Sequence, residues 1–283
     1  MPRSIWSGAI SFGLVNVPVK LYSAVSRKTV RFHQLNSDTG HRISQKRVDS
    51  VTDEEVPYEK IVKGFELTKE SYVVVTPEEL DSIAPEKTRA IDIEDFVDLE
   101  DIDPIFYDHP YYLVPDKGAG KAYGLLLEAM RESGKVAIAR VVLRSKEQLV
   151  AIRPGEGDVL TMETMIFHDE VVPTDDLDGV PDAKELKTTD RELKMAQQLI
   201  DSLTSDFEPS KYHDEYREKV LELIERKAAG EEITAAPEAP APAKVPDLMA
   251  ALEASLAAVR SDDDDKPKRK SSAKASERET SKA

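Results

Sequence analysis

The first 172 residues alternate short apolar runs with turn residues, a pattern typical of β-strands. Residues 11–22 mix β-branched and aromatic side chains with Gly13, Asn16 and Pro18, which predicts two short strands joined by a tight bend. Further strands are expected at 30–36, 72–75, 89–97, 110–114, 135–144, 148–153 and 158–167. Many short strands with few helices between them favour a mixed or antiparallel barrel over alternating βαβ units.

Two helices interrupt this strand-rich part. Thr76, Pro77 and Glu79 occupy the N-cap, N1 and N3 positions of a predicted short helix. A longer helix is expected at about 119–133, with Gly134 as its stop. It begins within KGAGKA at 117–122, which lacks the first glycine and the final Ser or Thr of a phosphate-binding loop, so no nucleotide site is predicted.

Residues 37–71 differ from their surroundings, because they are polar and have little periodicity. A connection of this length is usually functional or disordered. We therefore expect a long insertion in the barrel.

The pattern changes to helices after residue 182. Apolar stripes predict amphipathic helices at 183–206 and 210–228, which need a surface to cover them and so favour dimerisation. An Ala/Pro-rich linker follows, and then a short helix at 247–260 with apolar residues at helical spacing. From Ser261 the composition is typical of a disordered chain, and from Lys266 it is basic.

Charge is distributed unevenly. The 283 residues carry a net charge of −16, which argues against nucleic acid as a partner, but residues 1–50 hold eight basic groups and two acids. Local potential decides binding, so an acidic chain can still present a basic surface to phosphate. The alternative is a solvated exterior with chance segregation of charge.

Several classes of site are excluded by residue content. The chain has no cysteine, which rules out disulfides, cysteine-ligated zinc, iron–sulfur clusters and thiol nucleophiles. No apolar run reaches the roughly 18 residues of a membrane span, and the first residues lack the apolar core of a secretory signal. These features fit a cytosolic chain.

The remaining candidate chemistry is weak. The five histidines are scattered, with no pair spaced for a metal site. Asp92 and Glu94 lie on one face of a predicted strand and could converge on Mg²⁺ as in a nuclease, although a solvated outer face is the favoured interpretation. We expect no catalytic residue, no metal and no cofactor.

Residues 3–22 read RSIWSGAISFGLVNVPVKLY, and this string resembles the start of bacterial Ku proteins. The resemblance continues through FHQL at 32–35, IVKGFE at 61–66, YVVV at 72–75 and YYLVP at 111–115. It extends over about residues 3–228.

This resemblance implies a mixed α+β, mainly β fold: a Ku-type β-barrel with a long bridge insertion, C-terminal helices and a disordered basic tail. It also implies a homodimeric ring that binds double-stranded DNA ends without sequence specificity. Such a ring recruits and stimulates DNA ligase D in the non-homologous end joining repair of double-strand breaks. The protein would be no enzyme, would bind no membrane and would act in the bacterial cytoplasm at the nucleoid.

The same resemblance divides the chain. Residues 1–182 would form the barrel core, with the DNA-encircling bridge at about 37–71. Residues 183–230 would form a helical dimerisation region, and residues 231–246 would form the linker. Residues 247–260 would be the ligase-binding helix, and residues 261–283 would be the disordered basic tail. Candidate DNA-binding residues are Arg3, Lys20, Arg27, Lys28, Arg31, His41, Arg42, Lys46, Arg47, Lys60 and Lys63. Candidate ligase-binding residues are Leu248, Met249, Leu252, Leu256 and Val259.

Two alternatives from other classes remain at this stage. One is a Mg²⁺-dependent nuclease built on Asp92 and Glu94. The other is a scaffold that binds only proteins, through the long loop and the helix at 247–260.

Overall fold

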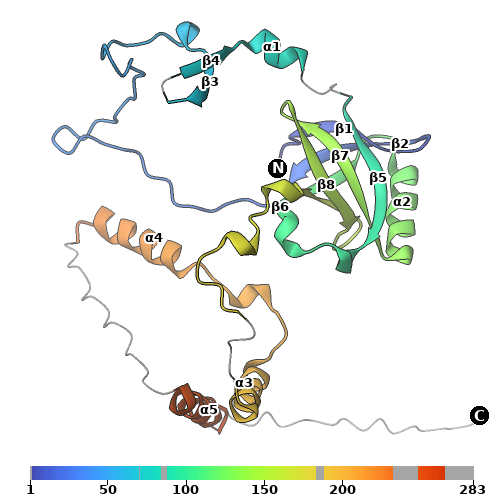
Figure 1. Ribbon diagram of the computed structural model, residues 1–283, viewed down its shortest axis with the longest axis vertical. Helices are drawn as coiled ribbons and strands as arrows, with labels where there is room; N and C mark the ends of the chain where they lie inside the picture. The colour runs from blue at the N-terminus through green and yellow to red at the C-terminus, as the bar shows by residue number, and fades with distance from the viewer. Residues whose placement is uncertain (1, 70, 84–87, 183–187, 232–247, 265–283) are drawn as a thin grey trace, which may run out of the picture. The chain divides into compact units, whose positions relative to one another are not determined.

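The computed structural model describes residues 2–69, 71–83, 88–182, 188–231 and 248–264 (Figure 1). The chain divides into two compact units, Met1–Asp176 and Leu177–Ala283. The predicted linker and basic tail lie almost entirely outside the described residues, as do the first five residues of the helix predicted at 183–206.

Seven strands of the first unit close into a barrel, which confirms the predicted fold. Around the barrel the order is β1-β2-β6-β9-β8-β7-β5. The pairing of β1 with β5 is parallel and closes the sheet, while the other neighbours are antiparallel. The strands are β1 (Trp6–Phe12), β2 (Val15–Ser23), β5 (Ala90–Asp98), β6 (Tyr107–Pro115), β7 (Lys135–Leu143), β8 (Lys146–Pro154) and β9 (Leu160–Met165).

The barrel interior is the main hydrophobic core. Alternate residues of each strand point inward, and Ile10, Leu21, Ile91, Ile152 and Met162 are completely buried. A smaller cluster lies on the other side of the sheet and includes Ile102, Val136, Ala151 and Met165. Two short 3₁₀ turns follow β5, η2 (Leu99–Asp101) and η3 (Pro104–Phe106), and Phe106 of η3 packs against that cluster.

Helix α2 (Gly120–Ser133) packs against β7 and β8 and matches the helix predicted at 119–133. Gly134 ends it with a φ of 68°, the left-handed conformation that glycine adopts without strain. Tyr123 anchors the helix to two strands. Its hydroxyl donates to the carbonyl of Leu113 at 2.6 Å and accepts from the amide of Leu160 at 2.6 Å.

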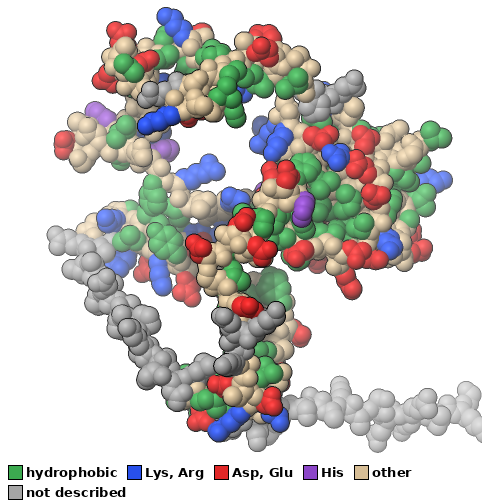
Figure 2. Space-filling model, in the orientation of Figure 1, with side chains coloured by type: hydrophobic (Ala, Val, Ile, Leu, Met, Phe, Trp, Pro, Cys, Tyr) green, Lys and Arg blue, Asp and Glu red, His purple; other side chains and the backbone are tan. Residues whose placement is uncertain are grey.

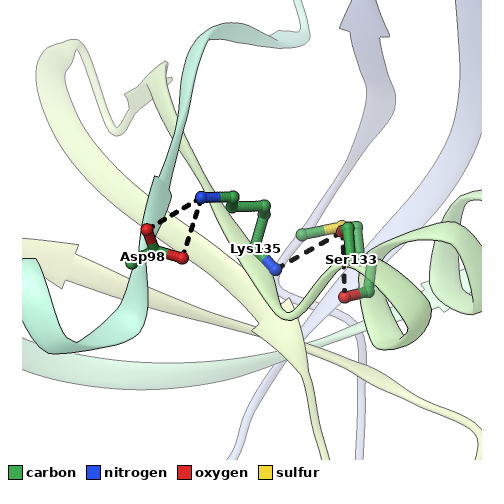
Figure 3. A network of polar contacts seen from close by, with 4 residues as sticks. Asp98, Ser133 and Lys135 are labelled. Atoms are coloured by element: carbon green, nitrogen blue, oxygen red, sulfur yellow. Dashed lines mark hydrogen bonds and ion pairs between the residues drawn. The ribbon is translucent and has the colours of Figure 1, made fainter.

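The junction between α2 and β7 is braced by polar contacts (Figure 3). The Lys135 ammonium lies 2.8 Å from both carboxylate oxygens of Asp98, its cross-strand neighbour on β5. The Lys135 amide donates to the Ser133 hydroxyl at 3.4 Å. These contacts tie the end of α2 and the start of β7 to β5.

A long insertion, residues 24–89, separates β2 from β5. It contains η1 (Tyr58–Lys60), the hairpin strands β3 (Lys63–Thr68) and β4 (Ser71–Val75), and the short helix α1 (Pro77–Ser82). The predicted capping box at Thr76 and Glu79 is confirmed. None of the described residues in the insertion is buried.

Two details of the sequence interpretation are wrong here. Residues 30–36 form no strand, because their alternating pattern meets no neighbouring strand. The segment has only an isolated bridge between Leu35 and Arg42, and Phe32 is 71% exposed. Residues 72–75 do form a strand, but they pair only within the β3–β4 hairpin and are largely exposed rather than buried.

The second unit is helical, as expected. Its described elements are α3 (Asp190–Leu203), η6 (Pro209–Lys211), α4 (Glu215–Ala228) and α5 (Leu248–Asp264). Helix α5 runs four residues past its predicted end at 260, so residues 261–264, which were expected to belong to the disordered tail, are helical. No helix in the described part of the chain is long and apolar enough to cross a membrane.

Candidate nucleic-acid interface

The two ends of the insertion lie at the same region of the barrel. The end of β2 lies beside the start of β1, where Trp6 pairs with Leu21. The start of β5 lies on the other side of β1, where Ala9 pairs with Ala90. The insertion is therefore a closed excursion of the chain that leaves and returns on either side of β1.

Charge divides the insertion into two limbs. Residues 24–47, here called the basic limb, carry six Lys or Arg residues against a single acid, Asp38. Residues 48–89, the acidic limb, carry five basic groups against eleven acids. Figure 2 shows Lys and Arg side chains along the insertion and many acidic ones over the barrel face in view. A polyanion would therefore be attracted to the basic limb and repelled elsewhere.

Most of the predicted DNA-binding residues are exposed. Within the described part of the chain, eight of the eleven form neither an ion pair nor a cation–π contact: Arg3, Arg27, Lys28, Arg31, His41, Arg42, Lys60 and Lys63. Their charges are consequently available to a phosphate ligand.

Two members of the set are engaged within the insertion itself. The Lys46 ammonium lies 2.6 Å from a carboxylate oxygen of Glu55. The Arg47 guanidinium carbon lies 5.4 Å from the centre of the Tyr58 ring, within cation–π range. Together with the bridge between Val48 and Glu55, these contacts brace a tight turn. Lys46 and Arg47 therefore have a structural role alongside any contact with DNA.

Lys20 is engaged on the barrel. Its ammonium lies 2.6 Å from the carboxylate of Asp116, across 96 residues of sequence. This hydrogen bond raises the pKa of Lys20 and lowers the pKa of Asp116 from their ordinary values. The pair fixes the Lys20 charge and largely neutralises it, so Lys20, like Lys46, is less available to a phosphate than the unpaired cations of the predicted set.

The carboxylates of β5 do not form the arrangement that a nuclease needs. A β-bulge between Ile93 and Asp95 breaks the alternation on which their convergence depended. The Glu94 carboxylate accepts from the Arg140 guanidinium at 2.9 Å. Among the described residues, no group of three or more His, Asp or Glu side chains is placed to hold a metal ion.

Sequence reasoning missed the apolar surface of the β3–β4 hairpin. Phe65 and Tyr72 are 66% and 59% exposed, and Val74 is 53% exposed. The run YVVV was a visible signal, but it was assigned to the interior. Exposed apolar side chains on both strands of a small hairpin are typical of a protein contact surface.

The sequence of the barrel matches a known protein family. Residues 11–195 match the family model described as the Ku70/Ku80 beta-barrel domain. The chain is 53% identical over 260 residues to the non-homologous end joining protein Ku of Anaeromyxobacter sp. (strain K), covering 92% of this chain and 87% of that protein. It is 47% identical over 259 residues to the protein of the same name from Heliobacterium modesticaldum (strain ATCC 51547 / Ice1), covering 91% and 92%.

Proposed function

The chain belongs to the Ku family of non-homologous end joining proteins, and from this premise we propose that it binds double-stranded DNA ends as a homodimeric ring and recruits a DNA ligase. The observation that carries the proposal is the insertion. It is 66 residues long, buries none of its described side chains and returns to the barrel on the other side of β1 from its origin, with a basic first limb. A segment with no core of its own is suited to pass around a ligand.

The chemistry of the basic limb favours the DNA backbone over base edges. Exposed Lys and Arg side chains from an irregular segment neutralise phosphates, which position a protein but carry no sequence information. No described helix of the insertion is long enough to read a major groove, since α1 spans only six residues. Binding is therefore independent of sequence, and a preference for ends follows from threading a closed ring.

A ring needs a second chain, and the molecule offers apolar surfaces for one. The β3–β4 hairpin exposes Phe65, Tyr72 and Val74. Helix α4 exposes Tyr216, Leu221 and Ile224 to different degrees. Burial of these surfaces between two copies would supply the hydrophobic free energy of dimerisation. Sedimentation at micromolar concentration tests this step, and a monomer there would contradict the ring.

The ligase would dock on α5. Its apolar stripe, represented by Met249, Leu252 and Leu256, is carried on an Ala/Pro-rich tether, and amphipathic helices of this kind bind in grooves of partner proteins. The partner proposed is DNA ligase D. Deletion of residues 245–260 is expected to abolish ligase stimulation while leaving DNA binding intact. Unchanged stimulation would remove α5 from the ligase interface.

The protein itself performs no chemistry on DNA in this proposal. Incubating it with a short labelled duplex and Mg²⁺ is expected to give a stable shifted complex with intact strands. Cleavage that disappears in a variant with Asp92→Asn and Glu94→Gln would instead support a nuclease. Failure to shift the duplex would support the protein scaffold.

A further inference from the structure

The helix proposed to meet the ligase is packed against another helix of its own chain. Helices α3 and α5 are in contact within the second unit, where Figure 1 shows them together. No other helix or strand of the described chain packs substantially on α5. Whatever shields its apolar stripe in the free protein is therefore α3.

The two contact faces follow helical spacing. On α3 the half-buried residues are Glu192, Met195, Ala196 and Leu199, at i, i+3, i+4 and i+7. On α5 they include Met249, Leu252 and Leu256, at i, i+3 and i+7. At 3.6 residues per turn each set forms one stripe along its helix. The stripe predicted to bind the ligase is the same stripe that α3 covers.

A polar contact fixes the register of the pair. The Arg191 guanidinium lies 3.3 Å from the Glu253 carboxylate, at the flank of the apolar faces. Both side chains are more than half exposed, so the ion pair adds little binding energy and mainly selects one alignment.

The covered stripe occupies only one side of α3. Leu193 and Ile200 are 53% and 64% exposed, and helical geometry puts them roughly a third of a turn or more around the axis from Met195 and Leu199. Helix α3 thus has a second apolar side for another partner, such as a second copy of the chain. Docking of α5 on the covered stripe therefore leaves the side with Leu193 and Ile200 free to contact that second partner.

From this packing we propose that α3 is an internal docking site for α5, and that the ligase must displace α3 to bind the same apolar stripe. This rests on the proposed role of α5 as the ligase-binding helix. A 17-residue helix is marginal alone in water, so α5 is stabilised by one cover or the other. The tether keeps α5 near α3 at an effective concentration of about millimolar, which lowers the apparent affinity for any competing partner.

The contact is tested first without ligase, by hydrogen exchange of the full-length protein. Leu199→Asp places a charge under the α5 stripe while keeping Leu193 and Ile200. We expect exchange across residues 249–257 to become about tenfold faster, because the helix loses its cover. Lys194→Asp is the control, since Lys194 is exposed and lies on the opposite side of α3. Equal exchange in Leu199→Asp, the control and the unchanged protein would overturn the contact.

A charge exchange tests the register without altering the apolar faces. Arg191→Glu is expected to speed α5 exchange by up to about fivefold, and adding Glu253→Arg is expected to restore the original rate. A double variant as fast as the single one would contradict the paired geometry.

The competition is tested by ligase binding to the same proteins. In Leu199→Asp a larger fraction of the molecules has α5 free of α3 and able to bind the ligase. This variant is therefore expected to bind DNA ligase D about tenfold more tightly than the Lys194→Asp control. Faster exchange with unchanged ligase affinity would overturn the competition while leaving the α3–α5 contact and DNA end binding in place. Loss of DNA binding by Leu199→Asp in a gel shift would instead indicate that the substitution disrupts the proposed ring.

Discussion

The basic limb supplies the most quantitative prediction. Arg27, Lys28 and Arg31 are exposed and, within the described chain, carry no ion pair. Each phosphate that a cation neutralises contributes about 0.9 to the slope of log affinity against log salt. The triple variant to alanine is therefore expected to lower that slope by about 2.7 per chain, or about 5.4 for a two-chain ring. At about 0.1 M salt the affinity falls by up to about 500-fold per chain.

The assay is fluorescence anisotropy on a blunt duplex at several salt concentrations. The control removes three exposed lysines from the helical unit, Lys194, Lys211 and Lys219. It changes net charge equally but leaves the basic limb intact, so its slope should match that of the unchanged protein. An unchanged slope in the first variant, or an equal fall in both, would refute the assignment of the basic limb to DNA.

Three further predictions concern the barrel and are measured by chemical denaturation. Gly8→Ala is expected to destabilise the barrel by about 1–3 kcal/mol, because the added Cβ would lie 2.1 Å from the carbonyl oxygen of Arg89. The control is Gly124→Ala on helix α2, where the added Cβ meets nothing within 4 Å and the substitution should be neutral or stabilising. Tyr123→Phe is expected to cost about 2–4 kcal/mol, because it leaves a buried main-chain amide and carbonyl without their hydroxyl partner; full stability in this variant would contradict the anchoring role. Burial raises the pKa of Glu163, so its contribution to stability is fully present below the unfolded value near 4.5 and is lost as pH rises through the higher folded value. The free energy of unfolding of Glu163→Gln should therefore rise relative to that of the unchanged protein between pH 4 and 7. A constant difference between the two free energies across this range would contradict the raised pKa.

The fold was predictable wherever local pattern and tertiary partner agreed. The seven barrel strands were all expected, because each is rich in apolar, β-branched or aromatic residues and each finds neighbouring strands to pair with around the barrel core. Thr76 and Glu79 specify a helix start through contacts three residues apart, and so that start was also predictable. Residues 30–36 have the same alternation as a strand, but nothing in a local pattern shows that a partner strand is missing.

The candidate site was predictable in its composition and not in its geometry. The excess of cations before residue 48 is visible in the sequence. Which of these cations are already engaged is not visible, because the partner of Lys20 is Asp116, 96 residues away. Likewise the apparent convergence of Asp92 and Glu94 depended on an unbroken strand, and the bulge after Ile93 removes it.

Encirclement of DNA is tested most directly by comparing linear and relaxed circular duplexes of equal length and sequence. A closed two-chain ring can enter and leave only through an end. If the ends of the linear duplex are blocked after loading, the protein is expected to remain on it through a high-salt wash and to be absent from the circle. Equal retention on both molecules would contradict the ring.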